Sequence, residues 1–235
     1  MNDAISLAQH LSHPLSLSAS LNFAARVGQF RREASMARAQ AETSILSSAE
    51  LGFSYWLAEA TILKGWALAE EGQAEEGLRQ MRQGLEAYAA TGARLWRLYY
   101  LALMAQVHGR MGRLQEALTE LAEAIELVQS TSEHEHEPEL HRLKGELILK
   151  GCRGASSDST IRKEAERCFQ EAIEIARSQH APSLELRAVM SMGRFLPQCG
   201  RKQEARTMLS TIDGWFTEGF ETTDLREAKA LLDGP

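Results

Sequence analysis

The chain has 235 residues, 44% of them hydrophobic and 25% charged, with a formal net charge of −6. This composition predicts a folded, helix-rich protein and argues against global disorder. The acidic balance argues against a generic nucleic-acid surface.

The sequence also carries signals about compartment. No apolar run approaches the ~20 residues that a helix needs to cross a bilayer, which predicts no membrane partner. The N-terminus lacks the charged region and apolar core of a secretion signal. Cys152, Cys168 and Cys199 stand at wide spacings, which favours a reducing compartment over a disulfide framework. We therefore expect a cytoplasmic protein.

A repeat of 40 residues runs along almost the whole chain. Its rows begin at Ser18, Ala58, Leu98, Pro138 and Leu186. Small residues recur in column eight (Ala25, Gly65, Ala105, Gly145, Gly193) and in column twenty (Ala37, Gly77, Ala117, Ala165, Ala205), and column twenty-four reads Ala41, Met81, Leu121, Phe169, Leu209. A fixed period of this length predicts stacked helix pairs whose small residues let two helices approach closely.

Residues 1–17 match the second helix of a leading row whose first helix is absent. Ile5 shares a column with Ile45 and Leu85, so the chain is expected to begin in mid-repeat, as an excised fragment would. The apolar face of Ile5 to Leu11 would then lack its cover. We expect self-association or fraying there.

Residues 18–214 are expected to form five repeats of two helices each. Row two predicts helices over 58–71 and 74–88, and row three over 98–110 and 115–128. Gly72, Gly112 and Gly200 share column fifteen, where glycine can take the left-handed conformation that ends a helix. Arg32 holds that column in row one, which predicts a different turn.

Breaks in the pattern predict connections. The insertion 151–160, GCRGASSDST, reads as a flexible surface loop. Pro182 is expected to open a helix and Pro197 to end or kink it. Residues 215–235 read as a C-terminal cap. Its helix spans 223–232, starts at an N-cap of Thr223 or Asp224, and has an apolar face of Leu225, Ala228, Leu231 and Leu232.

The columns resemble the tetratricopeptide repeat, which also has small residues at its eighth and twentieth positions. The resemblance implies an all-α, tetratricopeptide-like superhelix of about five helix-turn-helix repeats. The strings ILKGWALAEEGQAEEGL, ELHRLKGEL and WFTEGFETTDLREAKALL further resemble the C-terminal region of bacterial proteins with class III adenylate/guanylate cyclase and ATPase domains. That resemblance implies a signalling parent. The family's cyclase aspartates and P-loop have no matching positions in this chain, so the chain itself is expected to be non-catalytic.

Other candidate chemistry is weak. His134, His136 and His141 offer imidazoles for a metal, although their spacing fits no established closed site, and a solvated loop is the favoured interpretation. Cys152 has one neighbouring cation, Arg153, which is little support for a reactive thiol. No phosphate-binding glycine loop or nucleophile motif is present. We predict no cofactor.

The first helix of each row is expected to line a concave face. By analogy with tetratricopeptide repeats, columns two, five, nine, twelve and thirteen point inward. They give Asn22, Arg26, Trp66, Tyr99, Gln106, Arg110, Arg142, Glu146 and Arg194. Arginines there could bind carboxylates of a partner peptide, or could pair with glutamates such as Glu146 in adjacent rows.

The favoured function is a protein-interaction or sensor module within a cyclase/ATPase signalling protein, whose own ATPase and cyclase domains are candidate partners. One alternative is a stand-alone adaptor for a protein or peptide. A second is a small-molecule effector domain, as in transcription regulators. A concave pocket lined by Trp66 and Tyr99 would favour the small molecule, and a flat charged groove would favour a peptide.

Overall fold

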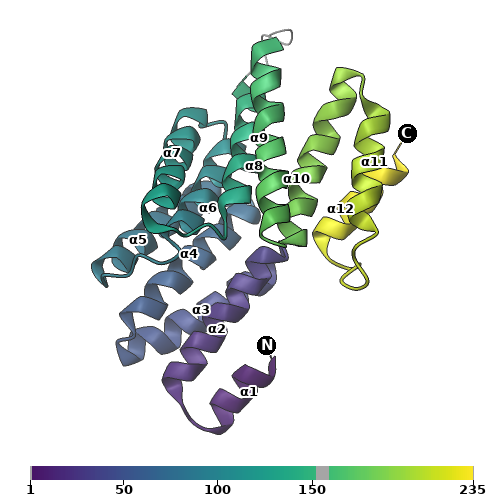
Figure 1. Ribbon diagram of the computed structural model, residues 1–235. Helices are drawn as coiled ribbons and strands as arrows, with labels where there is room; N and C mark the ends of the chain where they lie inside the picture. The colour runs from purple at the N-terminus through teal and green to yellow at the C-terminus, as the bar shows by residue number, and fades with distance from the viewer. Residues whose placement is uncertain (1, 152–158, 235) are drawn as a thin grey trace. The chain divides into compact units, whose positions relative to one another are not determined.

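The computed structural model describes residues 2–151 and 159–234, which form helices joined by turns and contain no strand (Figure 1). The all-α class is confirmed. The chain divides into two compact units, Met1–Val107 and His108–Pro235. The predicted loop 151–160, with Cys152, lies largely outside the described residues, because α8 ends at Gly151 and α9 begins at Ser159.

The first unit is built from consecutive antiparallel helices. They are α1 (Asn2–His10), α2 (Pro14–Phe30), α3 (Ala34–Leu51), α4 (Ser54–Glu70), α5 (Ala74–Ala90) and α6 (Arg97–Arg110), the last of which continues into the second unit. The predicted helices of row two are therefore extended by a few residues at one end each. Within this unit, the second helix of a row packs against the first, as α3 does on α2 and α5 does on α4.

The second unit repeats the pattern. It contains α7 (Leu114–Thr131), α8 (Glu137–Gly151), α9 (Ser159–Ser178), α10 (Pro182–Phe195), a 3-10 helix (Leu196–Cys199), α11 (Lys202–Asp213) and α12 (Thr223–Asp233). Figure 1 shows α8 and α9 as one hairpin and α10, α11 and α12 as neighbours. As predicted, Pro182 opens α10 and the α-helix ends two residues before Pro197.

The columns of small residues, eight and twenty, lie where the two helices of a pair touch. A Cβ placed on Gly65 of α4 would lie 2.6 Å from the carbonyl oxygen of Gly77 on α5. A Cβ on Gly145 would lie 2.6 Å from Cε1 of Phe169, a residue of column twenty-four. Columns eight and twenty therefore set the distance between the two helices of a hairpin, because a larger side chain would push their axes apart.

The turn between the helices of a row is the same in row one as in rows two, three and five. Gly72, Gly112 and Gly200 have φ of +91°, +77° and +77°, as predicted. Arg32 has φ of +60°, so the different turn predicted at this position is wrong. The N–H of Glu33 bonds the carbonyl of Gly28, and that of Gln73 bonds the carbonyl of Leu68. The need to satisfy the last carbonyls of the helix outweighs the arginine's preference for negative φ.

Helix α12 covers the end of the last hairpin. Leu225 and Ala228 are buried against a core made by α9, α10 and α11, with Leu231 and Leu232 packed at its edge. The helix begins at Thr223, as predicted, but its N-cap is Thr222, so the predicted N-cap of Thr223 or Asp224 is wrong. The preceding connection leaves Trp215 and Phe220 exposed. No helix among the described residues is long and apolar enough to span a membrane.

Candidate functional site

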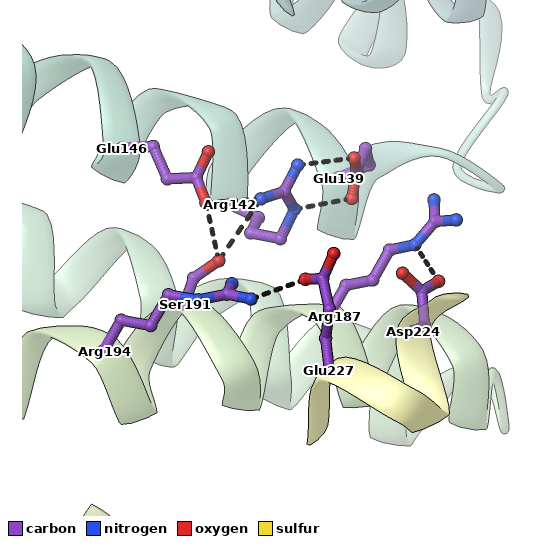
Figure 2. Close-up of polar contacts among 8 residues, drawn as sticks. All are labelled: Glu139, Arg142, Glu146, Arg187, Ser191, Arg194, Asp224 and Glu227. Atoms are coloured by element: carbon purple, nitrogen blue, oxygen red, sulfur yellow. Dashed lines mark hydrogen bonds and ion pairs between the residues drawn. The ribbon is translucent and has the colours of Figure 1, made fainter. Parts of the chain in front are cut away.

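In the second unit, the predicted site residues Arg142 and Glu146 lie on α8 and face α10 (Figure 2). Arg142 donates two hydrogen bonds to the Glu139 carboxylate, at 2.8 and 2.7 Å, and one to Glu146 at 2.7 Å. Ser191 of α10 accepts a further bond from Arg142 at 3.2 Å and donates to Glu146 at 2.8 Å. The buried arginine thus has three side chains around it, one of them from the next row.

The charges of this cluster stabilise one another. Burial by itself would raise the pKa of Glu139, but the positive charge and hydrogen bonds of Arg142 outweigh it and lower that pKa to about 2. Burial would lower the pKa of Arg142, and the carboxylates of Glu139 and Glu146 instead raise it. Arg142 therefore stays charged and fixed in place.

Two further arginines join α10 to α12. Arg187 donates to Asp224 at 2.7 Å, and Arg194 donates to Glu227 at 2.6 Å (Figure 2). Both partners of the Arg187 pair are mostly buried, whereas Arg194 and Glu227 are more exposed. We call these seven charged residues of α8, α10 and α12, together with Ser191, the arginine face of the second unit.

The predicted site residues of the first unit are mostly buried. Asn22 donates to the Ser18 carbonyl at 3.0 Å and to the Ser44 hydroxyl at 2.6 Å. Tyr99 donates to Gln29 at 2.7 Å across two rows of the repeat. The Asn22–Ser44 bond joins α2 to α3, the Tyr99–Gln29 bond joins α2 to α6, and both Asn22 and Tyr99 are buried.

Arg26 is the centre of the first unit's polar contacts. It forms a buried ion pair with Glu59 of α4, and its guanidinium lies 4.1 Å from the ring centroid of Trp96 and 5.2 Å from that of Phe23. Trp96 reaches this position with φ of +70°, a conformation that a tryptophan rarely adopts. Glu59 balances the charge that the fold removes from water.

The remaining predicted residues divide by exposure. Trp66 is fully buried, Gln106 is half-buried, and Arg110 and Arg194 are exposed. Of the nine predicted residues, five are buried: Asn22, Arg26, Trp66, Tyr99 and Arg142. Arg142 bonds Glu146, as the structural interpretation of these arginines anticipated, and Arg26 and Arg194 also pair with carboxylates.

Several residues of these clusters were not selected from the sequence, although a signal existed. Glu59 and Arg187 occupy column two, the column that gave Tyr99, and Gln29 occupies column twelve, another inward position. Asp224 and Glu227 lie outside the repeat, so no column could indicate them. A search for oppositely charged residues in inward columns of adjacent rows would have found the Arg26–Glu59 pair.

The histidine segment does not converge on one point. His134 contacts Glu137 at 2.9 Å, and His141 contacts Glu171 of α9 at 3.0 Å. Over residues 2–151 and 159–234, no group of three or more His, Cys, Asp or Glu side chains is arranged to hold a metal ion.

A cavity of about 840 Å³ opens between α3, α4 and α5. Its lining includes Ile45, Tyr55, Thr61, Gly84 and Ala87. The two residues expected to line an effector pocket, Trp66 and Tyr99, do not border it. This cavity therefore gives no support to a small-molecule site on the first-helix face.

Comparison with known proteins identifies the fold. No protein-family model and no curated protein matches the chain. Among solved structures, a variant of a Podosopora anserina putative kinesin light chain with nearly identical TPR-like repeats matches with a TM-score of 0.56 at 20% identity, covering 86% of this chain and 95% of the other. A second structure of that protein matches with a TM-score of 0.55 at 19% identity, covering 95% and 99%. The chain thus has the tetratricopeptide-like repeat fold.

Proposed function

We propose that this chain is a non-catalytic protein-interaction module that binds a carboxylate-bearing segment of a protein on the arginine face of the second unit. The carrying observation is that Arg142, Arg187 and Arg194 each hold a fixed place on adjacent first helices. Arginine anchors that are already positioned lose little entropy on binding. The buried Arg142 cluster stays in place as the frame of the site. The exposed Arg194–Glu227 pair separates so that Arg194 can bind the partner's carboxylate.

Replacing Glu227 by a partner carboxylate at Arg194 should cost little free energy. An exposed ion pair contributes ~0–1 kcal/mol, so a partner carboxylate can replace Glu227 at small cost. A guanidinium can hold such a carboxylate through two parallel hydrogen bonds. The burial of Trp66 and Tyr99 supports a peptide or protein ligand over a small molecule, because it removes the aromatic lining that an effector pocket would use.

We further propose that the binding partner is part of the same signalling protein. The strings ILKGWALAEEGQAEEGL, ELHRLKGEL and WFTEGFETTDLREAKALL support a bacterial, cytoplasmic parent with cyclase and ATPase domains. In that parent the repeats report the state of a bound segment to the catalytic domains. The gene tests this proposal. If the reading frame continues upstream of this segment and encodes both a cyclase and an ATPase domain, the chain belongs to a signalling parent. If it does not, the stand-alone adaptor is favoured.

The test uses the parent truncated before this chain, with the chain added as a separate protein. We expect binding by calorimetry and a change in cyclase or ATPase rate. Arg194→Glu should weaken binding at least tenfold, because it repels a carboxylate. Arg167→Glu is the matched control, since Arg167 is an exposed arginine on α9 that pairs with Glu171. Equal effects of the two substitutions would contradict the arginine face as the site.

A further inference from the structure

Eight of the aromatic side chains of the first unit form one connected cluster. Contacts of ring centroids at 4.8–6.1 Å join Phe23, Phe30, Tyr55, Trp56, Tyr88, Trp96, Tyr99 and Tyr100. The tyrosines of α6 and Tyr88 are buried and serve as its base. The cluster's outer edge reaches the surface on α2 and at the starts of α4 and α6.

That outer edge is a contiguous exposed patch. Phe23 is 47% exposed and Phe30 is 37% exposed on one side of α2, Leu95 is 55% exposed, and Trp56 and Trp96 are half-buried beside them. We call these five residues the aromatic face. Single exposed apolar residues are ordinary, but a contiguous aromatic patch is typical of an interaction surface.

The aromatic face lies in a basic setting. Helices α2 and α6 contain no Asp or Glu, although the chain as a whole is acidic. Arg94 and Arg97 flank Leu95 and Trp96 in the sequence, and Arg31 and Arg32 follow directly after Phe30, where Arg31 also pairs with Glu33 at 2.8 Å. Arg26 lies beneath the rings of Phe23 and Trp96, but Glu59 balances its charge, so the basic character comes from the surface arginines. The chemistry that fits this surface is an acidic segment with aromatic side chains.

The chain itself contains such a segment. Residues 214–222, between α11 and α12, hold Trp215 at 61% exposure, Phe220 at 58% exposure, and the carboxylates of Glu218 and Glu221. This stretch, which we call the acidic loop, contains no Lys or Arg. The period of 40 residues does not require aromatics there, so packing of the repeat does not explain them.

We propose that the acidic loop of one copy of this chain docks on the aromatic face of a second copy. The two surfaces differ, so the contact is head-to-tail, and a pair of copies keeps one free aromatic face and one free acidic loop. Trp215 and Phe220 supply the apolar anchors, and Glu218 and Glu221 lie against the arginines that border the aromatic face. The proposal does not depend on the arginine face or on a signalling parent.

The first experiment is sedimentation of the full chain at increasing concentration, from about 5 µM to about 500 µM, a range suited to a weak contact. We expect the average mass to rise above 26.1 kDa. The double variant Trp215→Ala/Phe220→Ala and the variant Phe23→Ala should each stay monomeric. Leu46→Ala removes an even more exposed leucine, on α3, and should associate like the wild type.

Mixing tests the head-to-tail geometry. A chain with Trp215→Ala/Phe220→Ala retains its aromatic face, and a chain with Phe23→Ala retains its acidic loop. Each alone is monomeric, but an equimolar mixture should form a dimer and nothing larger, because only one compatible pair of surfaces remains. A charge exchange adds a second check, since Arg94→Glu and Glu218→Lys should each weaken association and their mixture should restore it.

The outcomes that overturn the proposal are specific. A chain that is monomeric throughout the concentration range contradicts it and leaves the arginine face untouched. Association that survives the loop variant but is lost with Leu7→Ala/Leu11→Ala, at exposed positions on α1 and directly after it, assigns the contact to the N-terminal segment instead. A mixture of the two defective variants that stays monomeric also contradicts the head-to-tail contact.

Discussion

Arg142 donates two parallel hydrogen bonds to Glu139, and this contact keeps a largely buried carboxylate charged. The pair lies within one helix, one turn apart, so its geometry is already present when α8 forms. Its value depends on Ser191 and Glu146, which complete the hydrogen bonding of the guanidinium. The arginine face is thus a local motif that a neighbouring row locks in place.

The Glu139 contact predicts a pH dependence of stability. Its folded-state pKa of about 2 lies below the usual 4.5, so the stabilisation is fully present above about pH 4.5 and is lost as the pH falls toward 2. The stabilisation that this pKa shift gives the folded state is at most about 3 kcal/mol. In urea unfolding, Glu139→Gln should cost more at pH 7 than at pH 3. Glu135→Gln, at an exposed loop position, should cost little at either pH.

Removing the buried Arg142 should destabilise the fold more than removing the exposed Arg194. Arg142→Ala leaves Glu139 and Glu146 close together without their cation and should reduce the free energy of unfolding by about 3–5 kcal/mol. Arg194→Ala opens an exposed pair and should cost less than about 1 kcal/mol. Denaturant titrations followed by circular dichroism give both numbers. Similar costs for the two variants would show that Arg142 is not the frame of the face.

The Arg26–Glu59 pair allows a cycle of variants in the first unit. Arg26→Met alone leaves a fully buried carboxylate without its cation and should cost about 3–5 kcal/mol. Adding Glu59→Leu removes that isolated charge, and the double variant should recover most of the loss. A double variant that is no more stable than Arg26→Met would show that the cost comes from lost packing on Trp96 and Phe23 instead.

The close approach of α4 and α5 is tested at Gly65. Gly65→Ala gains about 1 kcal/mol of helix propensity, yet its Cβ would lie 2.6 Å from the Gly77 oxygen. We expect a net loss of about 1–3 kcal/mol from the forced separation of the helices. Gly214→Ala, where the nearest atom is 3.6 Å away, should be nearly neutral in the same thermal melts.

Much of the fold was predictable because the repeat is periodic. The columns located the helix contacts at Gly65 and Gly77, the glycine turns, and the ends of the helices of rows two and three to within a few residues. The failure at Arg32 has a local cause. The hydrogen bonds that end a helix are set by the backbone, so the same turn forms with an unfavourable residue, and the residue type alone misidentified it.

The candidate site was less predictable for a physical reason. The columns placed Arg26, Arg142 and Arg194 on the first helices, but exposure depends on which side chains arrive from other rows. Trp96 covers Arg26 only because a left-handed backbone turns its ring over the guanidinium. Asp224 and Glu227 join the arginine face from a helix outside the repeat.

The helix pairs, their period and the small residues between them could be read from the amino-acid sequence, because these follow from local propensity and from contacts at a fixed spacing. Which charges are buried in pairs and which aromatics reach the surface became visible only in the folded chain. Those outcomes depend on contacts between rows, where the free energy of a charge or a ring is set by its neighbours in space and by the water that they exclude.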